Sequence, residues 1–415
     1  MGNQNANKQL IVLFFASFAI LFVGMGLFPV LPLFAARFGA TNTMIGIFFA
    51  VISASTAAGP MFAGLLAERM GRKRLFIASG ILGVPALLLL GKATVLWQVI
   101  FMTSIVWFSG GLNLGLISIF TGLYAGEKNR GKSFTLMALA GPLGALAGGA
   151  TIGHLVELQG YTFMFSILGI LWASLPAVGI LVLQDKSDQT PAASKMEPIV
   201  ETRGFGKTFY LLLSASLLSA LGINISRLGT SLSMQTLEFS AGAIASSATV
   251  SGLISIPVAL LVGILSDRFG RRSFLMLSYL LGAGGTLVLS SASQLWQFWL
   301  AATLILIAYS LSGAMGSALA ADLLSPGELN RGMSWFNTAA SAASVMSFAG
   351  SGYLLDMIGA QSLYLLSAVL PVLAVSVFEI PSNLVSLKQL LPHGKAANSL
   401  ERSTKIDDNV CTAIC

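Results

Sequence analysis

The chain has 415 residues, of which 55% are hydrophobic and 9% are charged. Because ordinary soluble domains carry about 25% charged residues, this composition excludes a soluble globular protein and predicts one that lies in a lipid bilayer. The formal net charge of +7 does not indicate a nucleic-acid partner, since the basic residues are sorted between loops in the way that membrane insertion requires.

Residues that carry enzymatic chemistry are sparse and scattered. Cys411 and Cys415 lie in the polar C-terminal tail, His154 and His393 are far apart in the sequence, and no paired carboxylates or Ser/His/Asp constellation stand out. We therefore expect no catalytic residues, no bound metal and no cofactor. The sequence argues against an enzyme.

Twelve apolar runs are each long enough to cross a bilayer as a helix. A hydrocarbon core of ~30 Å needs about 20 residues in helical form, and backbone amides without water partners favour helices over strands. The runs of the first half are expected at residues 9–35, 43–67, 75–92, 95–122, 132–156 and 161–184. Those of the second half are expected at residues 207–233, 242–266, 273–291, 294–324, 332–355 and 360–383. The predicted fold class is an all-α membrane protein with twelve transmembrane helices in two six-helix bundles.

A polar stretch divides the chain into two halves. It is the longest polar stretch in the interior of the sequence, and it indicates a linker between the bundles. The predicted domains are an N-terminal six-helix bundle at residues 1–184, a cytoplasmic linker at 185–206, a C-terminal six-helix bundle at 207–383 and a cytoplasmic tail at 384–415.

The distribution of Lys and Arg predicts the orientation. With the N-terminus inside, every one of the 23 Lys and Arg residues except Arg37, Lys92 and Arg227 falls on the cytoplasmic side. The polar start at residues 1–9 lacks a small-residue cleavage site, so we expect the first run to be a retained helix. These features predict a multi-pass protein of the plasma membrane with both termini in the cytoplasm.

A motif that combines charge with glycine occurs twice, 199 positions apart. Residues 64–73 read GLLAERMGRK and residues 263–272 read GILSDRFGRR. The same offset relates Gly153 to Gly352 and Thr41 to Ser240. Because a repeat of six spans preserves the orientation in the membrane, we expect parallel bundles related by an axis along the membrane normal.

Both copies match the loop signature of the major facilitator superfamily, and the chain resembles a transporter of its twelve-span drug/proton antiporter branch. The resemblance implies the major facilitator fold, with the motif holding a cytoplasmic gate shut in the outward-facing state. Glu68 stands where the family usually has Asp. Asp322 is expected to find its partner in the basic cluster 268–272, whereas its counterpart in the first half is Thr121. The gate residues expected are Gly64, Glu68, Arg69, Gly71, Arg72, Gly263, Asp267, Arg268, Gly270, Arg271 and Asp322. The alternative is that these charges are ordinary basic residues at a membrane edge.

The expected fifth span contains a second signature. Residues 141–145 read GPLGA, in which Pro142 removes one backbone hydrogen bond and the glycines allow neighbouring helices to touch. The segment resembles the Gly-Pro motif of the antiporter branch and predicts a bent helix at Gly141, Pro142 and Gly144, with generic small-residue packing as the alternative. Residues 105–111 lack the Arg that this branch usually carries in the fourth span, which argues against its usual proton coupling.

The resemblance implies a central cavity lined by spans 1, 2, 4, 5, 7, 8, 10 and 11. The residues expected in it are Trp107, Asn113, Asn224, Arg227, Tyr309 and Asn337. Since most of them are uncharged, the cavity suits amphipathic or lipophilic small molecules. Arg227 is the one base expected inside a span, where a charge is costly enough to indicate function. The alternative is that Arg227 extends to the outer headgroups.

We therefore expect a monomeric secondary active transporter that exports amphipathic small molecules by alternating access. The alternatives are a facilitator or symporter for an organic anion or metabolite, and a non-transporting receptor built on a transporter fold. No expected span has an acid at its middle, and Glu157, Glu238 and Asp356 are expected to be solvated residues at outer ends. Two driving forces therefore stay open, which are exchange for protons and the membrane potential.

Overall fold

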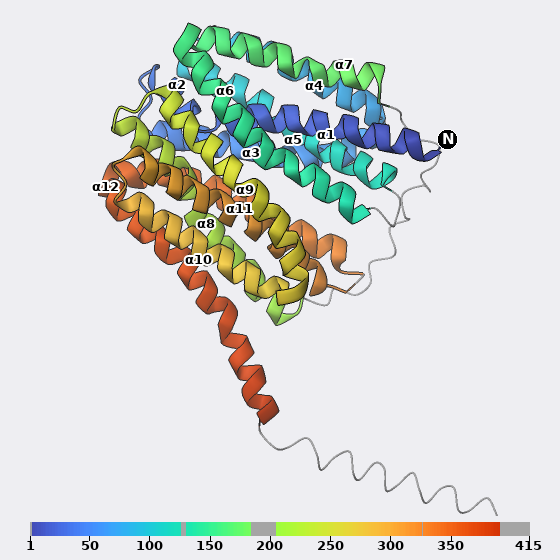
Figure 1. Ribbon diagram of the computed structural model, residues 1–415, viewed down its shortest axis with the longest axis vertical. Coiled ribbons are helices and arrows are strands. Elements are labelled where there is room, and N and C mark those ends of the chain that lie inside the picture. Colours follow the sequence, from blue (N-terminus) through green and yellow to red (C-terminus); the bar gives the residue numbers. More distant parts are fainter. Residues whose placement is uncertain (1, 126–129, 184–204, 326, 391–415) are drawn as a thin grey trace, which may run out of the picture.

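The computed structural model describes residues 2–125, 130–183, 205–325 and 327–390, and the regular structure in these ranges is helical (Figure 1). The helices are α1 (Gly2–Leu27), α2 (Leu31–Ala36), α3 (Asn42–Met70), α4 (Arg72–Leu90), α5 (Leu96–Tyr124), α6 (Arg130–Trp172), α7 (Ser174–Leu181), α8 (Lys207–Thr236), α9 (Ala241–Phe269), α10 (Arg271–Ser290), α11 (Leu295–Asp322) and α12 (Leu329–Leu390).

Two of the apolar helical segments each contain two membrane spans. Ten helical segments in the described ranges are long and apolar enough to cross a membrane; one of them runs from α6 through α7 and is 49 residues long, and another lies within α12 and is 48 residues long. At about 1.5 Å per residue each of the two is roughly twice as long as the hydrocarbon core is thick. Both are broken at a glycine with a left-handed φ, 79° at Gly160 and 77° at Gly359, a conformation that favours glycine. With these breaks the described part of the chain has twelve transmembrane helices, as predicted.

The first predicted span differs from the structure. It is expected as one run over residues 9–35, but α1 ends at Leu27 and the short helix α2 begins at Leu31. Pro29 lies in this gap, where it has no N–H to donate and disfavours helical geometry at Phe28. The interruption brings Phe28 to the interior cavity described below.

The helices form two bundles that follow the two halves of the sequence. In Figure 1 helices α1 to α7, coloured blue to green, lie on one side, and α8 to α12, coloured lime to red, lie on the other. Each bundle has buried aromatic side chains at its centre, such as Trp172 and Phe120 in the first and Tyr279 and Phe298 in the second. The predicted linker lies almost wholly outside the described residues, and the tail does so beyond residue 390. Helix α12 continues to Leu390, past the predicted bundle boundary at 383.

The two halves touch mainly along two helix pairs, α3 with α12 and α6 with α9. Glycines allow the close approach in both pairs. A Cβ added to Gly153 would lie 2.8 Å from the Cα of Gly242, and one added to Gly46 would lie 3.0 Å from the Cα of Gly352. Larger side chains would push these helices apart.

The contacts between halves gather at one end of the molecule. In Figure 1 the halves approach each other on the side of the labels α2 and α12 and spread apart toward the N-terminus. We name the first side, where α3 and α9 begin, the closed end. We name the opposite side, where α3 and α9 end at the turns around Gly71 and Gly270, the motif end.

Candidate functional site

A cavity of about 550 Å³ lies between the two halves. Helices α1, α3 and α5 line it from the first half, and α8, α11 and α12 line it from the second. Its volume falls within the range of about 300–1,000 Å³ that is typical of small-molecule sites. Most of its walls are apolar, with Trp107, Trp172, Phe336 and Phe348 as the large side chains besides Phe28. None of the described residues that line it is acidic.

Arg227 carries the positive charge on this wall. Its Cζ atom lies 4.7 Å from the centre of the Phe28 ring and 4.2 Å from the centre of the Tyr309 ring, distances at which a cation is attracted to an aromatic face. The rings come from opposite halves, since Tyr309 is on α11. The structure therefore places the guanidinium at the cavity between two rings rather than at a headgroup surface.

Asn224 lies one turn before Arg227 on α8 and is held in one orientation. Its side chain is buried, and Nδ2 donates to the Ala220 carbonyl at 2.9 Å and to Ser344 Oγ at 3.1 Å. These two bonds turn Oδ1 toward Arg227, whose guanidinium donates to it at 3.4 Å. Because Ser344 belongs to α12, the bonds join α8 to α12 beside the cavity.

Four of the six residues expected in the cavity line it, namely Trp107, Asn224, Arg227 and Tyr309. Asn113 does not. It is fully buried inside the first half, where its Oδ1 accepts a hydrogen bond from Ser79 Oγ at 2.6 Å. The physical reason is helical spacing, because α5 lines the cavity with residues 106, 107, 110, 111 and 114 and position 113 falls just beside this stripe, at its Val106 edge.

Asn337 is the second expectation that the structure contradicts. Its side chain is exposed and does not line the cavity. The residues of α12 that line the cavity are Phe336, Ala340, Ser341, Ser344 and Phe348. Asn337 lies one turn before Ser341 on the same face, toward the motif end, and is not part of the lining. The neighbouring Phe336 lines the cavity where Asn337 was expected.

Two carboxylates cross between the halves at the closed end. Asp356, on α12, accepts hydrogen bonds from Asn42 Nδ2 at 2.8 Å, from the Thr43 backbone N–H at 3.0 Å and from Thr43 Oγ1 at 2.7 Å. Glu157, on α6, accepts one from the Gly242 backbone N–H at 2.8 Å. Each acid thus caps the first turn of a helix in the other half, α3 or α9, where unpaired N–H groups and the helix dipole favour negative charge.

Glu157 and Asp356 are exposed residues at span ends, as expected, and the caps give them a role between the halves that the expectation did not include. The two acids are related by the same offset of 199 that relates the motif copies, as are their partners Thr43 and Gly242. The offset was the sequence signal that could have found them. Glu238 is likewise exposed and lies in the turn before α9.

Thr41 and Ser240, which are also 199 positions apart, lie at the N-termini of the same two helices, α3 and α9. Thr41 Oγ1 accepts from the Met44 N–H at 3.3 Å, and Ser240 Oγ accepts from the Ala243 N–H at 3.2 Å. Each is the N-cap of its helix. The two halves therefore present the same helix start to the acid of the other half.

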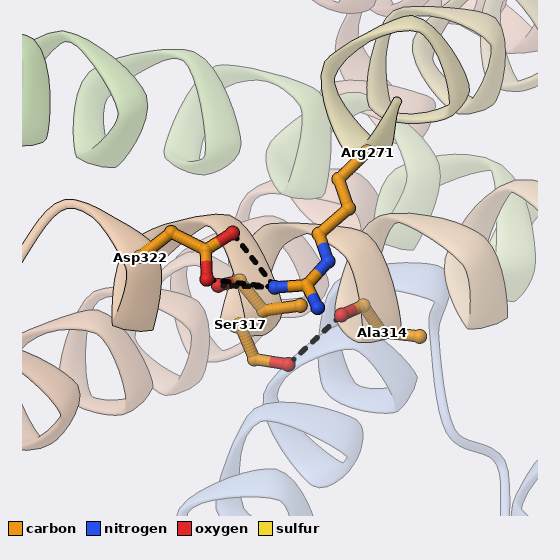
Figure 2. Close-up of polar contacts among 5 residues, drawn as sticks. Arg271, Ala314, Ser317 and Asp322 are labelled. Carbon is orange, nitrogen blue, oxygen red and sulfur yellow. Dashed lines mark hydrogen bonds and ion pairs between the residues drawn. The ribbon is translucent and has the colours of Figure 1, made fainter. Parts of the chain in front are cut away.

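The described ion pair at the motif end lies within one half. Figure 2 shows Arg271, at the start of α10, reaching the carboxylate of Asp322 at the end of α11. One guanidinium nitrogen lies 2.8 and 2.7 Å from the two carboxylate oxygens. A carboxylate at a helix C-terminus is disfavoured by the helix dipole, and Arg271 compensates for it. Arg271 is thus the member of the cluster 268–272 that pairs with Asp322.

The other residues expected at the gate lie as follows. Gly71 and Gly270 have φ of 81° and 85°, the left-handed values that form the turns from α3 to α4 and from α9 to α10. Glu68 and Arg69 are exposed in the last turn of α3, and Arg72 begins α4. Gly64 has open space where a Cβ would stand, so no close helix contact requires it here. Gly263 and the side chains of Asp267 and Arg268 lie outside what the structure describes.

The glycines of the expected fifth span serve contact with α1. A Cβ on Gly144 would lie 2.7 Å from the backbone of Leu21, whereas one on Gly141 would meet open space. Helix α6 runs through Pro142, and its described non-helical residue is Gly160. The bend at Pro142 stays a prediction.

Among the described residues, no group of three or more His, Cys, Asp or Glu side chains is placed to hold a metal ion.

Comparison with known sequences gives a family and two kinds of relative. The signature of the Major Facilitator Superfamily matches residues 13–226 and 212–402. The quinolone resistance protein NorA of Staphylococcus aureus (strain MSSA476) is 27% identical over 224 residues, which cover 52% of this chain and 56% of NorA. The chain therefore spans about half the length of this curated relative. The multidrug resistance protein MdtG of Salmonella paratyphi C is 26% identical over 71% of this chain and 74% of MdtG.

Solved structures share the fold at low sequence identity. A bacterial homologue of the human lysosomal transporter Spinster, in an inward-facing and occupied conformation, aligns with a TM-score of 0.71 at 14% identity over 90% of this chain and 96% of its own. The nucleoside transporter NupG aligns with a TM-score of 0.70 at 14% identity over 91% and 98%. Because the signature matches both halves and the fold agrees, the chain belongs to the Major Facilitator Superfamily, a family of membrane transporters rather than of enzymes.

Proposed function

We propose that the protein is a secondary transporter that works by alternating access and exports amphipathic or lipophilic small molecules. The observation that carries this proposal is the cavity of about 550 Å³ between the two halves, with mostly apolar walls and contributions from both bundles. An apolar site with few polar groups binds ligands through burial of their apolar surface. The names of NorA and MdtG, which refer to resistance, support export as the direction.

The contacts between halves support alternating access. They gather at the closed end, where the glycine contacts and the acid caps lie, and the halves spread toward the motif end. In the orientation that the basic residues predict, this arrangement faces the cytoplasm. Export then requires the caps to open at the closed end while the halves meet at the motif end.

The repeated motif is the proposed gate for that second state. The turns at Gly71 and Gly270 hold its charged residues at the ends of α3 and α9, where the halves would meet. The pair formed by Arg271 and Asp322 lies within the second half, so it can persist in both states. In this proposal, Glu68 and Asp267 make the contacts between halves when the motif end closes.

The remaining parts of the proposal concern setting and coupling. The protein is a monomer in the plasma membrane with both termini in the cytoplasm, and it exchanges its substrate for protons. Since the described cavity wall holds no acid, proton exchange would use carboxylates elsewhere in the chain. A facilitator or symporter for an organic anion or metabolite is the second candidate, which the lone positive charge of Arg227 favours.

Transport into everted membrane vesicles tests the proposal. Vesicles that contain the protein should accumulate a lipophilic dye against its gradient when energised, and vesicles without it should not. Dissipating the pH gradient with nigericin should stop accumulation if protons drive it, whereas valinomycin with potassium, which removes the membrane potential, should leave most of it. Equal accumulation with and without the protein across several dyes would refute export of this class.

A further inference from the structure

Building on the proposed transport function, we infer that Arg227 binds an anionic group of the substrate, so that the preferred substrates are amphipathic organic anions. The site pairs one guanidinium, for the carboxylate or sulfonate, with the apolar cavity, for the body of the molecule. Arg227 would thus determine which molecules the cavity selects.

Charge is the first argument. Arg227 lies on α8, inside a segment that crosses the membrane, and none of the described residues that line the cavity is an acid. A cation in such surroundings is costly, and proteins usually pair it with an acid or use it in function. An anionic ligand would supply the missing opposite charge, whereas a lipophilic cation would be repelled.

Hydrogen-bonding capacity is the second argument. A guanidinium carries five N–H donors in a planar fork that matches a carboxylate. In the described part of the chain Arg227 uses this capacity for a bond to Asn224 Oδ1, which at 3.4 Å is long. The Phe28 and Tyr309 rings contact its π face and accept no strong hydrogen bond. Several donors at the cavity are therefore available to a ligand.

The neighbouring polar groups do not compete for that role. A smaller cavity of about 70 Å³ shares Phe28 and Arg227 with the larger one and contains several hydroxyl groups. Three of these hydroxyls donate to carbonyls of their own helices, Thr230 to Ser226 at 2.8 Å, Ser247 to Ile244 at 2.7 Å and Ser251 to Ser247 at 2.7 Å. These hydroxyls therefore present lone pairs to a ligand rather than protons. Compared with them, Arg227 is the group suited to bind an anion.

The position of Arg227 also links binding to the two halves. Its two aromatic neighbours come from different bundles, Phe28 from the gap after α1 and Tyr309 from α11. Asn224, whose Oδ1 accepts a hydrogen bond from Arg227, is itself hydrogen-bonded to Ser344 of α12. If the halves separate at the closed end, the groups around Arg227 move relative to one another. The affinity of Arg227 for the anion then changes as well.

The test uses three probes that share one ring system and differ in charge. They are 2-naphthoate, 2-naphthamide and 2-naphthylmethylammonium, and their binding to the full-length protein in detergent is measured by isothermal titration calorimetry. Because hydrogen bonds to a charged group are stronger than neutral ones, we expect 2-naphthoate to bind about tenfold more tightly than the amide. The ammonium compound should bind most weakly.

Variants assign that preference to one residue. Arg227→Gln removes the charge at similar length and should make the naphthoate and the amide bind equally, with little change for the amide. Arg227→Lys keeps the charge without the planar fork and should keep part of the preference. Lys92→Gln removes an exposed positive charge in the turn after α4 and serves as the matched control, for which the wild-type preference should remain.

Two results would overturn the inference. One is equal affinity of the wild-type protein for the naphthoate and the amide, and it needs no variant, so a misfolded Arg227 variant does not leave the question undecided. The other is a preference that survives in folded Arg227→Gln. The proposed function fails separately: anion preference without uphill transport would refute export, and dye export without anion preference would refute this inference.

Discussion

At the closed end, Asp356 and Glu157 each reach across to the first turn of a helix in the other half, whereas at the motif end Arg271 and Asp322 pair within the second half. The first kind of contact holds two bodies together, and the second kind stabilises one body. The difference explains how the motif end can spread while its described ion pair stays intact. It also predicts that substitutions at the two ends will have different kinds of effect.

Gly46→Trp should have the largest effect, because it breaks the closed end by bulk. A Cβ at this position would already lie 2.6 Å from the Phe348 carbonyl oxygen, so an indole would force α3 and α12 apart. We expect dye transport to fall to background, because the cycle needs this end to close. The labelling of Ser247→Cys by a membrane-impermeant maleimide from the closed-end side should rise strongly, in a background where Cys411 and Cys415 are replaced by Ser.

Gly284→Trp is the matched control for that variant. Gly284 lies on α10 with open space where its Cβ would stand, so the same substitution should leave transport and labelling near the wild-type level. Normal transport by Gly46→Trp would show that the closed end need not close tightly.

Asp356→Asn should have the next largest effect, because it removes the charge that accepts three hydrogen bonds across the halves. Hydrogen bonds to charged groups contribute about 1.5–3 kcal/mol in buried sites, and exposure to solvent reduces this. A loss of about 1–2 kcal/mol would shift the population toward the open form about five- to thirty-fold. The same maleimide labelling measures the shift, and unchanged labelling would contradict the cap.

Glu157→Gln allows the two acid caps of the closed end to be compared with each other. Glu157 accepts hydrogen bonds from the Gly242 N–H and the Ser240 side chain, against three for its counterpart Asp356, so its substitution should raise labelling by a smaller factor. The double variant should exceed either single one, since the two caps hold different helix pairs. An effect of Glu157→Gln larger than that of Asp356→Asn would mean that the described bonds do not rank the two caps.

Asp322→Asn should have the smallest effect, and it should change the stability of the protein rather than the opening of the closed end. The side chains of Arg271 and Asp322 are 41% and 51% exposed, and exposed ion pairs typically contribute about 0.2–1 kcal/mol. We expect a small decrease in the melting temperature, measured by thermal unfolding, and no change in labelling at the closed end. The exchanged pair Arg271→Asp with Asp322→Arg should recover part of the loss. A rise in closed-end labelling would show that the two ends are coupled through this pair.

The sequence predicted the spans well because their signal is local. Each span is an apolar run of the required length, and the breaks at Gly160 and Gly359 fall between the runs predicted to end at 156 and 355 and to begin at 161 and 360. The interruption between α1 and α2 was missed, although Pro29 marks it, because the apolar run continues through the proline.

The candidate site was predicted less completely, because it depends on which helix faces meet. Asn113 and Asn337 are polar residues in spans that do line the cavity, but Asn113 lies beside the stripe that faces it and Asn337 lies one turn before the lining residue Ser341. The roles of Glu157 and Asp356 require knowledge of which helix start lies across from each acid. Their offset of 199 was present in the sequence, yet it gives equivalence between halves and not contact.

The sequence by itself determined that the chain is a duplicated twelve-span membrane protein with a repeated charged motif, because apolar length, charge sorting and repetition are properties of the chain alone. Tertiary structure decided that Arg227 lies between Phe28 and Tyr309 at a cavity, and that two acids join the halves at one end. Both depend on the rotation and tilt of helices far apart in the sequence. These are set by side-chain packing between helices, which no single span contains.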